Sequence, residues 1–256
     1  MGGHAEESVQ RVIDSIHQNI SEPITIDDMA RTAMFSKFHF TRIFQRATGV
    51  SPGRFLSAVR LQEAKRLLLS TSLSVTEISH KVGYSSVGTF SSRFKSSVGL
   101  SPTAYRQLRG FAPSIPVDTH RSSAHSMSIH GEVFQQDDGD GDGDGAEGTI
   151  FIGLFPDTIP QGRPARCTVL GGPGPFRLDN VPEGDWYLLA QSVVPGEEYV
   201  IGETPPTVAV HGPLTVRHGH LLRPVRIGLR PMRTLDPPVL LALLDTRRVA
   251  LSATAS

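Results

Sequence analysis

The chain is poor in cysteine, in long apolar runs and, over its first part, in acidic residues. Cys167 is the only cysteine among the 256 residues, which excludes an intramolecular disulfide and is typical of a reducing compartment. The longest purely apolar run, from Val239 to Leu244, is far shorter than the ~18 residues that span a bilayer. The first residues carry neither a basic segment nor an apolar core, so we expect no signal peptide. These absences predict a cytoplasmic protein without a membrane partner.

The scarcity of acidic residues is confined to one part of the chain. Residues 1–110 contain 14 Lys and Arg against 8 Asp and Glu, a net charge of +6. Residues 111–256 contain 11 Lys and Arg against 17 Asp and Glu, a net charge of −6, and none of these basic residues is a lysine. A basic part joined to an acidic part suggests that the basic part has a nucleic-acid partner.

Composition also divides the chain into four parts. Glycine and proline become dense beyond residue 110, and the stretch 111–128 has the composition of a linker. We therefore predict a helical domain over 1–110, a linker over 111–128, a β-rich domain over 129–233 and a tail over 234–256. Within the tail, the segment Val239–Leu251 predicts a short amphipathic helix that packs on the β-rich domain or on another chain.

An internal repeat is the most informative feature of the first 110 residues. At an offset of 50, Phe40, Phe44, Gly49 and Ser51-Pro52 recur as Phe90, Phe94, Gly99 and Ser101-Pro102. Further upstream the offset is 49, and Thr25, Met29, Ala33 and Phe35 correspond to Ser74, Ile78, Val82 and Tyr84. The second copy therefore contains one extra residue between Tyr84 and Phe90.

Each copy predicts a helix, a tight turn and a second helix. Ser74 and Glu77 have the spacing of a capping box, and Thr25 with Asp28 is a weaker version of it. Gly83 suits the turn of the second copy, whereas Met34 occupies that place in the first. A helix before the first copy and a long one over 51–69 bring the expected total to about seven helices.

Two such motifs on one stiff helix can present two helices to DNA. The second helix of a helix-turn-helix enters the major groove, and successive major grooves lie ~34 Å apart on one face of the duplex. For a single copy, helices that merely pack together would be the better interpretation. Two copies in register, each with caps and a Ser-Pro helix start, on a basic domain, favour DNA binding.

The residues that carry this pattern resemble the DNA-binding domain of AraC/XylS-family transcriptional regulators over about residues 8–109. The motifs of that resemblance are Ser36-Lys37-x-His39-Phe40, Gly49-x-Ser51-Pro52, Ala64-x-x-Leu67-Leu68, Val82-Gly83-Tyr84, Phe94-Lys95 and Gly99-x-Ser101-Pro102-x-x-Tyr105-Arg106. Most members carry this domain at the C-terminus, whereas here it comes first.

The resemblance implies contacts to base edges from the first copy at Ser36, Lys37, Phe38, Thr41 and Arg42. Arg42 is the leading candidate, because a guanidinium pairs with guanine through two hydrogen bonds; a surface salt bridge is the alternative. Phe38 would contact a thymine methyl group or else close the edge of the core. Contacts to phosphates are expected from Arg46, Arg54, Arg60, Arg93 and Lys95, each against the alternative of a solvated surface charge.

The second copy departs from the family pattern where it would meet DNA. Its candidate base contacts are Ser86, Val87, Gly88 and Ser92. The family usually has an arginine at the position of Ser92, and Val87 and Gly88 replace larger polar residues. We therefore expect this copy to depend more on phosphate contacts and DNA shape than on base edges.

The region after the linker has the alternation of short strands broken by glycine and proline. Candidate strands cover 128–134, 149–155, 167–170, 175–181, 186–193, 207–211, 214–217 and 225–229. This pattern predicts an antiparallel β-sandwich, and residues 174–192 resemble transthyretin-like or carboxypeptidase-regulatory-like sandwiches. Such modules bind ligands or mediate association, and the resemblance carries no activity with it.

Other chemistry finds little support in the sequence. The Asp/Gly loop over 137–145 lacks the carboxylate that an EF-hand requires at its twelfth position, and we interpret it as a solvated hairpin loop. His211, His218 and His220 could form a metal cluster, but isolated histidines at strand edges fit better. Nucleophile-elbow, zinc-protease and phosphate-loop motifs are absent, so we expect neither an enzyme nor a cofactor.

The sequence thus predicts a DNA-binding transcriptional regulator whose β-rich domain senses a ligand or mediates self-association. Its expected partner is double-stranded DNA; RNA polymerase, a small-molecule effector and a second copy of the chain stay open. One alternative is an interaction protein that works mainly through the β-rich domain, with weak, non-specific DNA binding. An enzyme in the β-rich domain, tethered to DNA, is the least supported alternative.

Overall fold

The computed structural model describes residues 2–110, 127–136, 149–193, 206–217 and 222–240. The chain divides into two compact units. Residues 1–110 form the helical unit together with the segment 233–241, and the strands of the β unit lie between these two stretches. Each unit has its own hydrophobic core.

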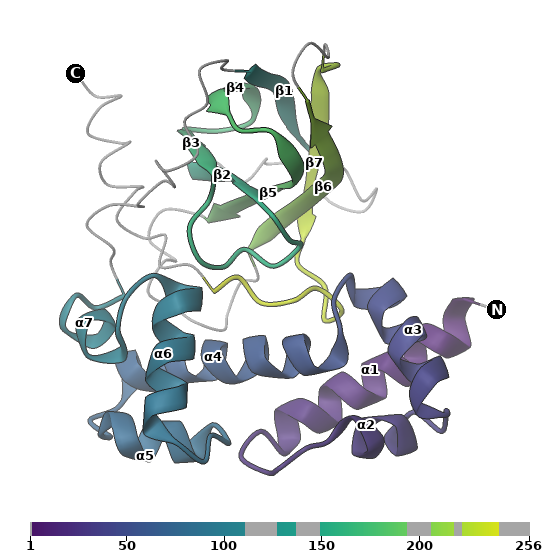
Figure 1. The fold of residues 1–256 in the computed structure, drawn as a ribbon, viewed down its shortest axis with the longest axis vertical. Coiled ribbons are helices and arrows are strands. Elements are labelled where there is room, and N and C mark those ends of the chain that lie inside the picture. Colours follow the sequence, from purple (N-terminus) through teal and green to yellow (C-terminus); the bar gives the residue numbers. More distant parts are fainter. Residues whose placement is uncertain (1, 111–126, 137–148, 194–205, 218–221, 241–256) are drawn as a thin grey trace, which may run out of the picture. The chain divides into compact units, whose positions relative to one another are not determined.

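Seven helices make up the described part of the helical unit, as the sequence predicts (Figure 1). They are α1 (Gly2–Gln18), α2 (Ile26–Thr32), α3 (Lys37–Thr48), α4 (Pro52–Ser70), α5 (Val75–Lys81), α6 (Val87–Val98) and α7 (Pro102–Gln107). The first copy of the repeat forms α2 and α3, and the second forms α5 and α6. The long helix α4 connects the two copies.

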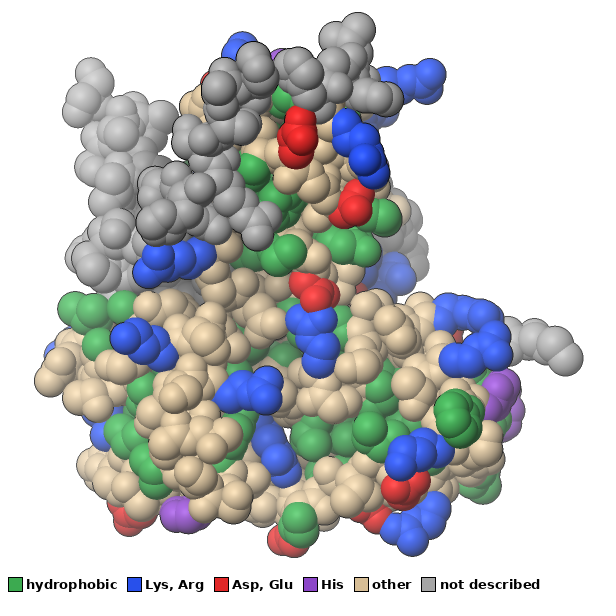
Figure 2. Space-filling model, in the orientation of Figure 1, with side chains coloured by type: hydrophobic (Ala, Val, Ile, Leu, Met, Phe, Trp, Pro, Cys, Tyr) green, Lys and Arg blue, Asp and Glu red, His purple; other side chains and the backbone are tan. Residues whose placement is uncertain are grey.

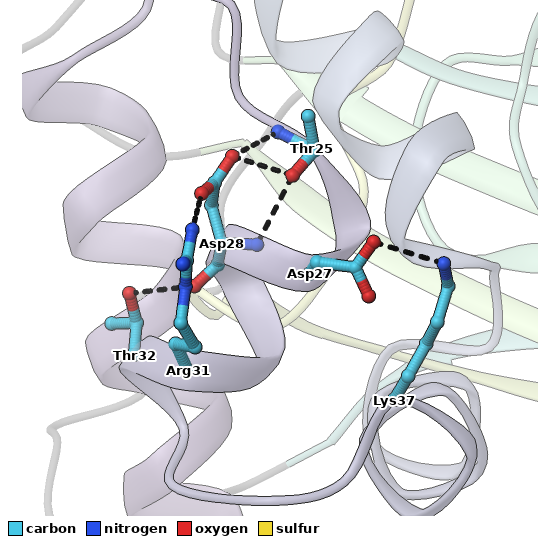
Figure 3. Close-up of polar contacts among 6 residues, drawn as sticks. All are labelled: Thr25, Asp27, Asp28, Arg31, Thr32 and Lys37. Atoms are coloured by element: carbon cyan, nitrogen blue, oxygen red, sulfur yellow. Dashed lines mark hydrogen bonds and ion pairs between the residues drawn. The ribbon is translucent and has the colours of Figure 1, made fainter.

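The first helix of each copy, α2 or α5, starts with a capping box. The hydroxyl of Thr25 accepts a hydrogen bond from the backbone N–H of Asp28, whose carboxylate accepts one in return from the Thr25 N–H at 2.8 Å (Figure 3). Ser74 and Glu77 repeat the arrangement at the start of α5. The Thr25 box is thus as complete as the Ser74 box. Hydrogen bonds that the carboxylate of Asp28 accepts from the Thr25 hydroxyl, the Thr25 N–H and Arg31 lower its pKa from 3.8 to about 2.

The two copies also repeat their aromatic cores. Phe44 lies between Phe40 and Phe55, with both ring centroids 5.4 Å from its own. In the second copy, Phe94 lies between Phe90 and Tyr105, at 5.7 and 5.5 Å. Gly49 and Gly99 end the two second helices in the left-handed conformation, with φ of 77° and 92°. The sequence repeat is therefore a structural repeat.

Helix α4 is buried along most of its length, including positions that its sequence would place at the surface. Lys65 is among the buried residues, and its Nζ donates a hydrogen bond to the carbonyl of Val239 at 3.1 Å. Residues 233–240, which we call the strap, follow the last strand and belong to the helical unit. Leu240 in the strap is fully buried. The strap therefore packs against α4 as part of the helical unit.

The β unit contains seven described strands in one mixed sheet, with the order β3-β2-β5-β6-β7-β1-β4. They are β1 (Met127–Gln135), β2 (Thr149–Phe155), β3 (Arg166–Leu170), β4 (Gly174–Val181), β5 (Gly184–Val193), β6 (Thr207–Val216) and β7 (Val225–Pro231). Strands β1 and β7 pair in parallel, and the other pairs are antiparallel. The end strands β3 and β4 also contact each other, which nearly closes the sheet into a barrel.

The predicted antiparallel sandwich is therefore wrong, although the strands lie close to where the sequence places them. A sandwich and a barrel share the same alternation of inward and outward residues, so the alternation cannot distinguish them. Pairing decides between them, and here the first strand joins the last one in parallel. The inward residues form one core, which includes Ile152, Trp186 and Ile227.

Two further predictions about this region need correction. The candidate strands 207–211 and 214–217 form a single strand, β6, which bulges at Gly212-Pro213 opposite Tyr187 of β5. A Cβ at Gly212 would lie 2.8 Å from the carbonyl oxygen of Trp186, so this glycine permits a close approach where the sequence suggests a turn. Val239 and Leu240, where the predicted tail helix would begin, are not helical, and the rest of that prediction lies outside the described residues.

Other predictions fall on residues outside the described ranges. They concern the Asp/Gly loop, most of the linker, His218, His220 and the tail beyond residue 240. Over the part of the chain that the structure covers, no helix is both long and apolar enough to cross a bilayer.

Candidate nucleic-acid interface

The first turn of α3 protrudes from the helical unit. Ser36 caps this helix in an extended conformation, and the turn before it passes through Met34 at a φ of 57°. Ser36, Lys37, Phe38 and His39 are all exposed, whereas Phe40 is fully buried and anchors the helix from below. The start of the helix is therefore presented to solvent on a rigid base.

Phe38 is the most unusual side chain of this turn. It is 87% exposed, and Met34 in the preceding turn is 74% exposed. Large apolar side chains with so little cover are uncommon on a monomeric surface and indicate an interaction site when they gather. This exposure does not fit the alternative in which Phe38 closes the edge of the core.

The polar candidates on α3 have different surroundings. Lys37 forms an exposed ion pair with Asp27 at 3.0 Å (Figure 3). The hydroxyl of Thr41 donates to the carbonyl of Lys37 at 2.9 Å, which leaves its methyl group to meet a ligand. Arg42 is exposed, and no ion pair or hydrogen bond holds its guanidinium among the described residues. Arg42 thus has the freedom to reach a base edge.

Helix α6 presents fewer side chains that can contact bases. The Ser86 hydroxyl caps the helix by accepting a hydrogen bond from the Thr89 N–H at 3.4 Å. Val87 is half-buried, and Gly88 and Ser92 are exposed. A Cβ at Gly88 would meet only the Ser86 Oγ, at 3.7 Å, so space does not require glycine here. The exposed side chains at the start of α6 are therefore short, and few of them extend far from the helix.

The basic candidates differ in how far they are exposed. Arg46, Arg54, Arg93 and Lys95 are exposed on α3, α4 and α6. Arg60 differs, because its Nε donates to the carbonyl of Ile20 at 3.2 Å and its Nη2 donates to that of Glu22 at 2.6 Å. We therefore leave Arg60 out of the proposed phosphate contacts.

Helices α3 and α6 lie near opposite ends of α4 and run in about the same direction across it (Figure 1). Figure 2 shows Lys and Arg side chains along the visible face of the helical unit, from the end that holds α6 to the end that holds α3. The two protruding helix starts and the basic residues around them form the candidate interface.

Sequence reasoning missed two features of this interface. It treated Met34 only as an awkward turn residue, although the side chain is exposed beside the reading helix. It also placed Arg60 at the surface, because a charged residue on a long helix is usually solvated. Arg60 is instead half-buried and donates to two backbone carbonyls. The only signal for this role was its position in the middle of a helix with apolar residues on most sides.

Within the described ranges, no group of three His, Cys, Asp or Glu side chains could hold a metal ion. Cys167 on β3 is half-buried, and burial raises the pKa of its thiol. A thiol with a raised pKa is a weak nucleophile at neutral pH.

Known proteins resemble the helical part of the chain. The family model described as a helix-turn-helix domain matches residues 29–108. The lactose operon transcription activator of Staphylococcus xylosus is 32% identical over 100 residues, which cover 39% of this chain and 36% of that protein. The chain therefore spans about a third of the length of this relative. The DNA-binding domain of AdpA, solved with a target DNA, is 29% identical, and the match covers 39% of this chain and 89% of that one with a TM-score of 0.38.

A shorter relative matches over most of its own length. The HTH-type transcriptional activator AarP of Providencia stuartii is 31% identical over 98 residues, which cover 38% of this chain and 73% of that protein. The matched helix-turn-helix domain begins within α2 and covers α3 to α7, and with them α4 and the whole second copy of the repeat. The chain belongs to the AraC family of helix-turn-helix, DNA-binding transcriptional regulators.

Proposed function

We propose that the protein is a sequence-specific transcriptional regulator that reads one DNA site with both helix-turn-helix motifs of a single chain. The start of α3 provides direct base readout through Arg42, Phe38 and Thr41. The start of α6 positions the protein through phosphate contacts and the shape of the groove. A monomer then recognises a site that needs no two-fold symmetry.

The observation that carries this proposal is the exposure of the first turn of α3 on a buried aromatic base. Phe38 and Arg42 point away from the core, while Phe40 and Phe44 are fully buried. A helix with this division can enter the major groove without losing its packing. The net charge of +6 over residues 1–110 supports the attraction to phosphates.

We assign effector binding or self-association to the β unit. This unit has a core of its own, separate from that of the helical unit, and can therefore respond to a ligand or to a second copy as an independent module. The similar proteins carry the names of regulators rather than enzymes, which supports a non-enzymatic role. Contacts with RNA polymerase would follow from activation, for which AarP is named.

Selection of bound duplexes from a random library, with the full chain, tests this function. We expect enrichment of one sequence that binds at least ~10³-fold more tightly than a scrambled duplex, with an affinity that falls steeply as salt rises. The double variant Phe38→Ser with Arg42→Ala should lose the enrichment. Arg177→Ala, which changes an exposed arginine of β4, should keep it.

Equal binding of the selected and scrambled duplexes would contradict the proposal. Such a result would favour the alternative of an interaction protein with weak, non-specific DNA binding. It would also assign the main function of the chain to the β unit.

A further inference from the structure

The two helix-turn-helix motifs meet at one half-buried junction in the middle of α4. Arg60 extends from α4 to the connection between α1 and α2, where its guanidinium donates to the carbonyls of Ile20 and Glu22 at 3.2 and 2.6 Å. These carbonyls follow the end of α1 and precede the first helix-turn-helix. Arg60 therefore ties α4 to the first motif through two charge-assisted hydrogen bonds.

The turn of the second motif packs against the same group. A Cβ at Gly83 would lie 2.5 Å from the Arg60 Nη2 and 2.6 Å from the carbonyl oxygen of Ile20. Gly83 has a φ of 81°, so it serves both the turn and this close approach. The turn between α5 and α6 thus approaches both the Arg60 guanidinium and the backbone of the connection before α2.

A second contact joins the second motif to α4 one turn away. The hydroxyl of Tyr84 lies 3.4 Å from that of Ser57. Tyr84 also packs its ring against Phe90 of α6, with centroids 5.4 Å apart. The junction, which comprises Ile20, Glu22, Ser57, Arg60, Gly83 and Tyr84, therefore has a path of contacts from the first motif to the reading helix of the second.

We propose that this junction fixes the angle between the two reading helices and so determines which half-site spacing the protein accepts. This proposal rests on the function proposed above. It adds a specificity-determining role for Arg60, although Arg60 itself does not contact DNA. Arg60 is in this sense a positioning residue.

The geometry of DNA makes spacing a sensitive readout. A turn of the duplex contains 10–10.5 base pairs, so one inserted base pair rotates the second half-site by roughly 35° and moves it by ~3.4 Å. Two helices held at a fixed angle cannot follow this change without losing contacts. Two helices joined by a flexible junction can follow it, because each motif has its own aromatic core.

The experiment compares the selected site with versions that carry one base pair more or one fewer between the half-sites. We expect the wild-type chain to prefer its own spacing by about tenfold or more, which corresponds to the ~1.4 kcal/mol that a lost contact costs. For Arg60→Ala we expect the preference to fall to about threefold or less, with the base preferences within each half-site unchanged. Arg60→Lys, which keeps one cationic donor for the two carbonyls, should give an intermediate preference.

A matched control is available on the same helix. Arg66 is exposed and pairs with Glu63 of α4, outside the junction. Arg66→Ala should keep the wild-type spacing preference. An equal loss of affinity at every spacing in Arg60→Ala, or an unchanged preference, would overturn the proposal.

A measurement without DNA separates this proposal from the proposed function. Spin labels at Gln45→Cys on α3 and Ser96→Cys on α6, in a Cys167→Ser background, report the distance between the motifs. We expect a narrow distribution that broadens in Arg60→Ala and in Arg60→Lys but not in Arg66→Ala. The distribution could broaden in Arg60→Ala although the wild-type chain prefers no DNA sequence. This result would support the role of the junction and contradict the proposed function. An unbroadened distribution in a folded Arg60→Ala chain would refute the junction itself.

Discussion

The Lys65 Nζ donates a hydrogen bond to the carbonyl of Val239, which lies 174 positions further along the chain. The ammonium group is buried between α4 and the strap, and burial lowers its pKa from the usual 10.5 to about 8. A single carbonyl partner compensates a buried positive charge only in part. The contact therefore joins the strap to α4 at an energetic cost.

This cost predicts a pH dependence that belongs to Lys65. Below pH 8 the ammonium is charged in both states and the folded state carries the full penalty. Between pH 8 and 10.5 the unfolded chain binds more protons than the folded one, so the free energy of unfolding rises with pH. Lys65→Met should remove this rise and should be neutral or stabilising at pH 7.

Urea unfolding at pH 7, 8, 9 and 10 measures both effects. The difference between the wild type and Lys65→Met is the relevant quantity, because other groups titrate in both proteins. Parallel pH curves for the two proteins would show that Lys65 is not buried as described.

The strap predicts a second effect on stability. Leu240 is fully buried in the helical unit, so Leu240→Ala should lower the free energy of unfolding of that unit by ~2–5 kcal/mol. Leu108→Ala is the matched control, since Leu108 is 39% exposed and its truncation should cost less than about 1 kcal/mol. Thermal unfolding followed by circular dichroism at helical wavelengths compares the two. Equal shifts in both variants would place the strap outside the core.

Arg42 and Arg46 lie one turn apart on α3 and should behave differently. We expect Arg42→Ala to lose discrimination at one base pair by ~1–3 kcal/mol. Arg46→Ala should weaken all duplexes alike and reduce the slope of log affinity against log salt by about 1. Affinities for single-base variants of the selected site, at three salt concentrations, distinguish the two. A uniform loss in Arg42→Ala would assign it to a phosphate.

Because the side chains at the start of α6 are short, a longer one placed there should add a base preference. Ser92 is exposed, and Ser92→Arg should add a preference for guanine in the second half-site of ~1–3 kcal/mol. Ser96→Arg adds the same charge one turn later and should raise affinity without a base preference. The same panel of duplexes detects both effects. If Ser92→Arg also raises affinity uniformly, α6 does not enter the groove as proposed.

The sequence predicts the helical unit well because its signals are local. A helix start is marked by Ser74 with Glu77, and a helix end followed by a new start by Gly49 with Ser51. The residues of each pair lie close together in the sequence, and the structure contains the helix starts and ends that they imply. The exposure of α3 follows as well, because the repeat separates the buried Phe40 and Phe44 from the residues between them.

The remaining features depend on contacts between residues far apart in the sequence. The parallel pairing of β1 with β7 closes the sheet, and no pattern inside either strand specifies that partner. In the sequence, Arg60 resembles an ordinary surface arginine. Its two carbonyl partners lie some 40 positions earlier, and only the structure shows them. Likewise, nothing in the strap indicates that Leu240 packs in the helical unit rather than on the β unit.

The arrangement of two reading helices on one chain is tested most directly by hydroxyl-radical footprinting of the full protein on its selected site, together with the stoichiometry of the complex. We expect one chain per duplex and two protected windows on the same face, about 10 base pairs apart. A single protected window, or two chains related by a palindromic site, would contradict the account.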